Sequence, residues 1–136
     1  MKSSEVPNEE FVCLVDDDPA ILKSIGRLLA SNGIDVKTFN DPKNFLVHVG
    51  EHRVELVILD IWMNGMNGLE VQAKLSRLSP QTRVILITGR KDPAVEKTAR
   101  QFGAAAFFTK PFDDVEFLDA VSAALGSPQL RHRPKV

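Results

Sequence analysis

Short apolar runs, each followed by a polar or charged residue, recur along this chain of 136 residues. The clearest are the runs 11–15, 56–59 and 84–87, which lead into Asp16, Asp60 and Thr88. Continuous apolar runs of this length are typical of strands that are buried on both faces of a parallel sheet. Because the carboxyl ends of parallel strands lie along one edge of the sheet, we expect these polar side chains to converge there.

Helical patterns separate the apolar runs. In three places an aspartate that suits an N-cap precedes a proline that suits the first helical turn, namely Asp18-Pro19, Asp41-Pro42 and Asp92-Pro93. Strands are expected near 11–16, 34–39, 55–60, 83–88 and 104–109. In the fourth helix, Val95, Ala99 and Phe102 are expected to face the core. Five strand-then-helix units predict an α/β fold, a five-stranded parallel sheet with helices on both faces.

Length and composition limit the class of protein. The 136 residues suffice for one domain, expected over 10–126, with a flexible N-terminus at 1–9 and a tail or linker at 127–136. The net charge of −1 and the short apolar stretches make neither nucleic acid nor a membrane an expected partner. The single cysteine, Cys13, excludes an internal disulfide, and we therefore expect a cytoplasmic protein.

Asp16, Asp17 and Asp60 are expected to share one edge of the sheet. Two carboxylates about 4 Å apart repel each other by about 4 kcal/mol at an effective dielectric constant near 20. Either one of them is protonated or a cation lies among them. Carboxylates and water suit a hard ion such as Mg²⁺. Lys110 and Thr88 can bind a phosphoryl group from neighbouring strands, which makes Asp60 the candidate nucleophile for an aspartyl phosphate.

Several short motifs together resemble those of a known family. They are Leu14-Val15-Asp16-Asp17-Asp18, Leu59-Asp60, Met66-Asn67-Gly68, Ile87-Thr88-Gly89, Gly103-Ala104 and Lys110-Pro111-Phe112. Over about 10–126 the chain resembles the receiver domain of two-component response regulators, most closely the transcription-regulator branch whose fourth strand ends in Ile-Thr-Gly. The resemblance implies the flavodoxin-like receiver fold, with strand order 2-1-3-4-5.

The resemblance also implies a role for each acidic residue. Asp60 would be the phosphoacceptor, and it would bind Mg²⁺ together with Asp17 and the backbone carbonyl of Trp62. Asp16 would act mainly through a water molecule on that ion.

Lys110, Thr88 and Phe107 complete the implied site. Lys110 would pair with the phosphoryl group, and its peptide bond to Pro111 is expected to be cis. Thr88 would move toward the phosphate, and Phe107 would change rotamer with it. This switch would alter the surface formed by the fourth helix, fifth strand and fifth helix.

Four residues near the implied site stand out. Many receivers have proline four residues after the acceptor aspartate and aspartate before the turn glycine, whereas this chain has Asn64 and Asn67. Both changes are expected to loosen or reshape the loop. Trp62 and Arg90 lie where the family tunes its dephosphorylation rate, and their bulk predicts a phosphoryl lifetime longer than minutes.

The leading interpretation is a phosphorylation-dependent signalling switch. A sensor histidine kinase or phosphotransferase would donate to Asp60, and a second copy of the chain is a candidate partner after phosphorylation. Such a domain is not an enzyme in the usual sense, because its chemistry is limited to its own phosphorylation and dephosphorylation. Two alternatives are a Mg²⁺-dependent phosphohydrolase and a binding module that no longer uses phosphate, the latter suggested by Asn64 and Asn67.

Overall fold

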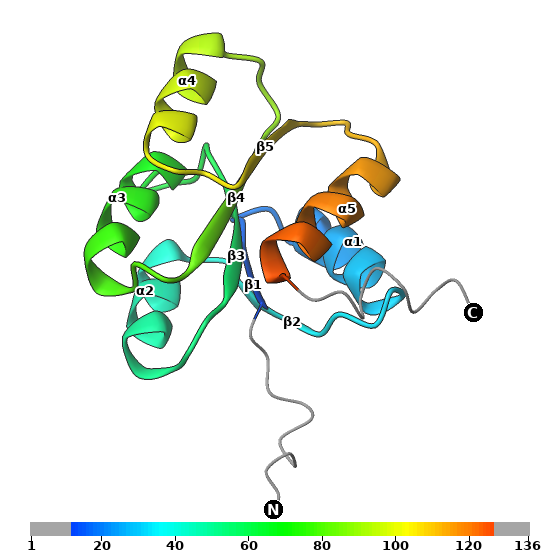
Figure 1. The fold of residues 1–136 in the computed structure, drawn as a ribbon, viewed down its shortest axis with the longest axis horizontal. Coiled ribbons are helices and arrows are strands. Elements are labelled where there is room, and N and C mark those ends of the chain that lie inside the picture. The colour runs from blue at the N-terminus through cyan, green and yellow to red at the C-terminus, as the bar shows by residue number, and fades with distance from the viewer. Residues whose placement is uncertain (1–11, 127–136) are drawn as a thin grey trace, which may run out of the picture.

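Five strands alternate with five helices in the computed structural model, which describes residues 12–126 (Figure 1). The strands are β1 (Val12–Val15), β2 (Val36–Phe39), β3 (Leu56–Asp60), β4 (Arg83–Thr88) and β5 (Ala106–Thr109). The helices are α1 (Pro19–Ala30), α2 (Pro42–Glu51), α3 (Gly68–Leu78), α4 (Pro93–Gln101) and α5 (Asp114–Leu125). The N-terminus and tail expected at 1–9 and 127–136 lie outside the described residues.

All strand pairs are parallel, and the strand order is β2-β1-β3-β4-β5. The α/β fold class and the predicted order 2-1-3-4-5 are therefore confirmed. The central strand β3 is buried along its whole length, as its uninterrupted apolar sequence predicts.

Helices cover both faces of the sheet (Figure 1). On one face α2, α3 and α4 enclose a cluster that includes Phe45, Val71 and Leu86. On the other face α1 and α5 enclose a second cluster that includes Leu29 and Phe117. Alternate residues of each buried strand contribute to the two clusters, because successive side chains of a strand point to opposite faces.

The predicted Asp-Pro helix starts are confirmed. Asp18 is the N-cap of α1 and accepts a hydrogen bond from the backbone N–H of Ala20 at 2.9 Å. Asp41 and Asp92 cap α2 and α4 in the same way. Each cap satisfies a backbone donor that the first helical turn leaves without a partner. Each cap fixes where a helix begins after a strand, and so helps to position the residues of the loop between them.

Phe102 was expected to face the core, and this prediction is wrong. The side chain is 56% exposed, whereas Ala99, three residues earlier, is fully buried. The helix ends at Gln101, Phe102 is its C-cap, and Gly103 follows with a φ of 93°. Because the chain leaves the helix at this point, the helical spacing that aligns Phe102 with Ala99 no longer applies.

Candidate functional site

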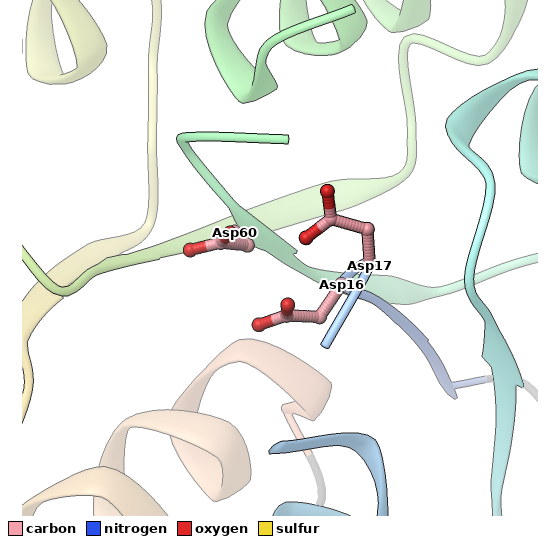
Figure 2. Close-up of side chains that lie close together, drawn as sticks. All are labelled: Asp16, Asp17 and Asp60. Carbon is pink, nitrogen blue, oxygen red and sulfur yellow. The ribbon is translucent and has the colours of Figure 1, made fainter. Parts of the chain in front are cut away.

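The strand register brings the predicted acidic residues together. Leu14 pairs with Ile58 and Val15 with Leu59 on the neighbouring strand. The next residues, Asp16 and Asp60, therefore lie side by side at the carboxyl ends of the two strands. Carboxylate oxygens of Asp16, Asp17 and Asp60 all lie within 4.8 Å of one another. Figure 2 shows the three side chains gathered at the ends of β1 and β3.

Asp16 is the most deeply buried of the three acids. It is 1% exposed, and its Oδ1 accepts a hydrogen bond from the backbone N–H of Asp18 at 2.9 Å. Its Oδ2 is buried without a hydrogen-bond partner and lies 3.7 Å from Nζ of Lys110. Burial raises the pKa of Asp16, and this outweighs the opposing effects of the Asp18 N–H and Lys110.

The side chain of Asp60 is also buried. It is 6% exposed, and its Oδ1 lies 3.8 Å from Nζ of Lys110. Burial, followed by the negative charge of Asp16, raises the pKa of Asp60 to about 6 despite the nearby ammonium. The ammonium group of Lys110 opposes this rise in pKa but does not cancel it.

Asp17 lies at the more accessible side of the cluster. Its Oδ2 accepts a hydrogen bond from the backbone N–H of Asn64 at 2.9 Å, across 47 positions of the sequence. This contact joins the end of β1 to the loop between β3 and α3. Asn64, which stands where many receivers have proline, is thus hydrogen-bonded directly to the acidic cluster.

The donor set fits a hard divalent cation. Three carboxylates converge, and the buried Oδ2 of Asp16 lacks a hydrogen-bond donor. Hard oxygen ligands are those that Mg²⁺ prefers, and such a charge would relieve the mutual repulsion of the acids. Trp62 follows Asp60 by two residues, and the predicted use of its backbone carbonyl as a ligand remains a prediction.

Lys110 and Thr88 lie at the same edge, as predicted. Nζ of Lys110 approaches both Asp16 and Asp60, and its backbone N–H donates to the carbonyl of Thr88 at 2.7 Å. The Lys110-Pro111 peptide bond is cis, which confirms that expectation. The carboxyl ends of β4 and β5 therefore supply a hydroxyl (Thr88) and an amine (Lys110) at the edge where the acids that end β1 and β3 lie.

The Thr88 hydroxyl is engaged within its own loop. Thr88 is fully buried, its Oγ1 donates to the carbonyl of Arg90 at 3.1 Å, and it accepts from the backbone N–H of Arg90 at 3.1 Å. Any interaction of this hydroxyl with a phosphoryl oxygen would replace at least one of these bonds.

Phe107 and Phe108 point to opposite faces of the sheet, as their adjacency on β5 requires. Phe107 is 9% exposed and belongs to the cluster covered by α2, α3 and α4. Phe108 packs on the other face, with its ring 5.6 Å from that of Phe117. The predicted switch residue Phe107 is therefore an inward-packed side chain one strand away from Thr88.

Trp62 and Arg90 are in contact. The guanidinium carbon of Arg90 lies 4.2 Å from the centre of the Trp62 ring, a distance typical of a cation–π interaction. The two residues come from the loops after β3 and β4, so their contact bridges these loops beside the acidic cluster. The sequence indicated both residues, but it gave no signal that they touch.

Gly68 has a packing role that was not predicted from the sequence. A Cβ atom at this position would lie 2.5 Å from the carbonyl oxygen of Asp60, and the Gly68 N–H donates to the carbonyl of Ile61 at 2.8 Å. The start of α3 thus packs directly on the backbone of the acceptor residue. The Asn67-Gly68 pair was a detectable signal, because glycine permits such close approach.

Asn67 forms a complete capping box with Glu70. Its side chain accepts from the Glu70 N–H at 2.9 Å, and the Glu70 carboxylate accepts from the Asn67 N–H at 2.8 Å. The amide oxygen of Asn67 thus provides the cap that an aspartate would provide, and the predicted loosening or reshaping of the loop remains a prediction.

A model of the response regulator receiver domain matches residues 12–122 of the chain. The chain belongs to the response regulator receiver family. The response regulator protein TmoT of Ectopseudomonas mendocina is 40% identical over 117 residues, which cover 86% of this chain and 53% of TmoT. This receiver chain spans about half the length of the curated relatives it matches, such as TmoT at 53%.

Two solved structures place the receiver domain among known folds. A response regulator receiver protein from Burkholderia phymatum is 41% identical, with a TM-score of 0.76 over 87% of this chain and 96% of that one. The beryllofluoride-activated receiver domain dimer of NtrC4 is 28% identical, with a TM-score of 0.80 over 85% of this chain and 95% of that one.

The predicted family, fold and general function are confirmed by these likenesses. The receiver domain belongs to a regulatory family of two-component signalling, in which it acts as a phosphorylation-dependent switch. The likenesses give no support to a phosphohydrolase or to a phosphate-independent module. Within residues 12–126, every helix is too short or too polar to traverse a bilayer.

Proposed function

We propose that Asp60 accepts a phosphoryl group from the phosphohistidine of a sensor histidine kinase or phosphotransferase. A carboxylate oxygen of Asp60 attacks phosphorus, the phosphorus–nitrogen bond breaks, and the donor imidazole leaves with the electron pair of that bond and takes up a proton. The observation that supports this proposal best is the convergence of Asp16, Asp17 and Lys110 around Asp60.

Asp17, Asp60 and the backbone carbonyl of Trp62 are the proposed Mg²⁺ ligands, with Asp16 acting through a water molecule on the ion. A bound Mg²⁺ supplies positive charge against the carboxylates and the phosphoryl oxygens. Two observations support this proposal: three carboxylates converge within 4.8 Å, and the buried Oδ2 of Asp16 has no hydrogen-bond partner, its nearest cation being Lys110 at 3.7 Å.

Lys110 and Thr88 would respond to the new phosphoryl group. Lys110 already lies 3.8 Å from Asp60 and can pair with the added negative charge. Thr88 would exchange its bonds with Arg90 for a bond to a phosphoryl oxygen. Phe107, on the neighbouring strand, would change rotamer as the Thr88 side chain moves.

The surface of α4, β5 and α5 is the proposed output of the switch. Helix α4 contributes one fully buried residue, Ala99, and it follows directly on the loop that Thr88 and Arg90 form. A change at Thr88 can therefore shift α4 without disrupting much buried surface. The partner would be another protein or a second copy of the chain, and the dimeric form of the NtrC4 receiver supports the second choice.

The phosphoacceptor proposal is tested by intact mass after incubation with acetyl phosphate and Mg²⁺. One added phosphate is expected on the wild-type protein and none on Asp60→Asn, since the amide is not a nucleophile. Equal labelling of the two proteins would show that another residue is the acceptor. Stoichiometric labelling without sustained release of phosphate from a phosphomonoester would fit a regulatory domain rather than an enzyme.

Trp62 and Arg90 are proposed to lengthen the phosphoryl lifetime beyond minutes. The two residues follow Asp60 and Thr88 by two positions each and are in contact, so together they would obstruct a water molecule that approaches phosphorus. Separate Trp62→Ala and Arg90→Ala variants should each hydrolyse the aspartyl phosphate faster, as measured by loss of labelled protein with time. A wild-type half-life of seconds at neutral pH with Mg²⁺ would contradict this proposal.

A further inference from the structure

We propose that the backbone N–H of Asn64 is a positioning group that holds Asp17 in place for the divalent cation. The inference rests on the proposed function, because it assumes that Asp17 is a metal ligand. It assigns a role to the main chain of one residue in the β3–α3 loop, and this role is separate from the chemistry of the Asn64 side chain.

The three acids of the cluster are not held equally. Asp16 is 1% exposed and is fixed by the Asp18 N–H, and Asp60 is 6% exposed at the end of a buried strand. Asp17 lies at the accessible side, and within residues 12–126 the Asn64 N–H makes the hydrogen bond to its carboxylate at 2.9 Å. Without this donor, Asp17 would be free to rotate away from the cluster into solvent.

The donor itself is held by the loop that carries it. Three residues further on, Asn67 begins the capping box of α3, and the Gly68 N–H bonds to the carbonyl of Ile61. These contacts fix both ends of the segment that presents the Asn64 N–H. A carboxylate oxygen has two lone pairs, so one bond from Asn64 leaves Oδ1 and part of Oδ2 of Asp17 available to a cation.

The hydrogen bond also fixes the orientation of the Asp17 carboxylate beside the carboxyl groups of Asp16 and Asp60. Partners of metal ligands typically change metal affinity by roughly 10–100-fold when they are removed. We therefore expect the loss of the Asn64 N–H to weaken Mg²⁺ binding by about tenfold.

Proline at this position gives a clean test, because it has no N–H. The resemblance to receivers that carry proline there indicates that the fold accepts it. Asn64→Ala is the matched reference, since it shortens the side chain to a similar extent and keeps the N–H. The experiment titrates Mg²⁺ into the full chain of each variant and follows the fluorescence of Trp62, the single tryptophan of the chain.

The expected result is a dissociation constant for Mg²⁺ about tenfold higher in Asn64→Pro than in Asn64→Ala. A difference of less than about twofold, with Mg²⁺ binding intact in the wild type, would overturn the positioning role and leave the proposed function standing. Absence of Mg²⁺ binding in the wild-type protein would instead overturn the proposed metal site and this inference together.

A second measurement covers the case in which Asn64→Pro does not fold. Hydrogen exchange of the Asn64 amide, read by NMR, is compared in the wild-type protein and in Asp17→Ala. The exchange is expected to be at least about tenfold faster in Asp17→Ala, because its acceptor is gone. Equal exchange in the two proteins would overturn the proposal.

Discussion

The loops after β3 and β4 both border the acidic cluster, but they are built differently. The β3–α3 loop is tied by the Asn64 contact to Asp17, by the capping box at Asn67, and by the close packing of Gly68 on Asp60. The β4–α4 loop is held near the cluster by the Thr88 hydroxyl and by the contact of Arg90 with an indole ring.

The helices that follow the two loops also differ, because α3 buries more of its residues than α4 does. Helix α3 buries four residues, Gly68, Val71, Gln72 and Leu75, whereas α4 buries Ala99. Few buried contacts make an element easier to displace. The difference indicates that the first loop keeps the acceptor residue in position, while the second is the side on which a change at the site can move a helix.

The largest effect should come from adding a methyl group at Gly68. In Gly68→Ala the new Cβ would lie 2.5 Å from the Asp60 carbonyl, so backbone atoms must shift. We expect a loss of about 3 kcal/mol in the free energy of unfolding, measured with urea. Gly89→Ala, in the other loop, meets no atom within 4 Å and should change stability by less than about 1 kcal/mol. Similar losses at both glycines would remove the distinction between the loops.

The charge of Asp60 should have the next largest effect. The pKa of Asp60 is about 6 in the folded protein, above its ordinary value of 3.8, so between these values the folded state binds more protons than the unfolded state. The protonated carboxyl group of Asp60 therefore contributes fully to the stability of the fold below pH 3.8, and this contribution is lost as the pH rises through about 6. One pKa unit corresponds to about 1.4 kcal/mol, so the ionised carboxylate destabilises the fold by about 3 kcal/mol.

Asp60→Asn removes this ionisation while keeping the side chain volume. At pH 8 without Mg²⁺ the variant should be more stable than the wild type by up to about 3 kcal/mol, and the gain should shrink as the pH falls toward 4. Added Mg²⁺ should stabilise the wild type more than the variant. Urea unfolding across this pH range checks both statements, and a variant that is less stable at pH 8 would contradict them.

The capping box should have a smaller effect. Asn67→Ala removes the acceptor for the Glu70 N–H and should lower the free energy of unfolding by about 1 kcal/mol. Asn67→Asp keeps an acceptor at the start of α3 and serves as the control, which should retain most of the stability. If Asn67→Ala matched the wild type, the β3–α3 loop would be less firmly held than its contacts indicate.

The smallest effect is expected at Phe102. Its side chain is 56% exposed at the end of α4, so Phe102→Ser should change the free energy of unfolding by no more than about 0.5 kcal/mol. Phe117→Ser is the control, because it makes the same substitution at a buried position. It should lower the free energy of unfolding by several kcal/mol in the same urea measurement. A large loss at Phe102 would mean that α4 is more firmly packed than its burial indicates.

The fold could be predicted well because its signals are local. Unbroken apolar runs mark the strands, Asp-Pro pairs mark three helix starts, and parallel pairing then brings Asp16, Asp60, Thr88 and Lys110 to one edge. Phe102 was misplaced because helical spacing cannot show where a helix ends.

The contacts between loops could not be predicted from the sequence. The bond from Asn64 to Asp17 and the stacking of Arg90 on Trp62 depend on the paths of loops that meet only in the folded chain. For the same reason the sequence predicted only that Asn64 would loosen or reshape the loop. In the structure its backbone N–H forms a hydrogen bond to Asp17 that proline could not form. The resemblance identified where the chain departs from the family but not what the departure does.

The pairing of the first and last helices affects how the domain can fold during synthesis. Ile25 and Leu29 of α1 share one core cluster with Phe117 and Val121 of α5, and Figure 1 shows the two helices beside each other. At roughly 5–20 residues per second, α5 leaves the ribosome on the order of ten seconds after α1. Until then the part of the apolar face of α1 that α5 covers in the finished domain has no helix against it.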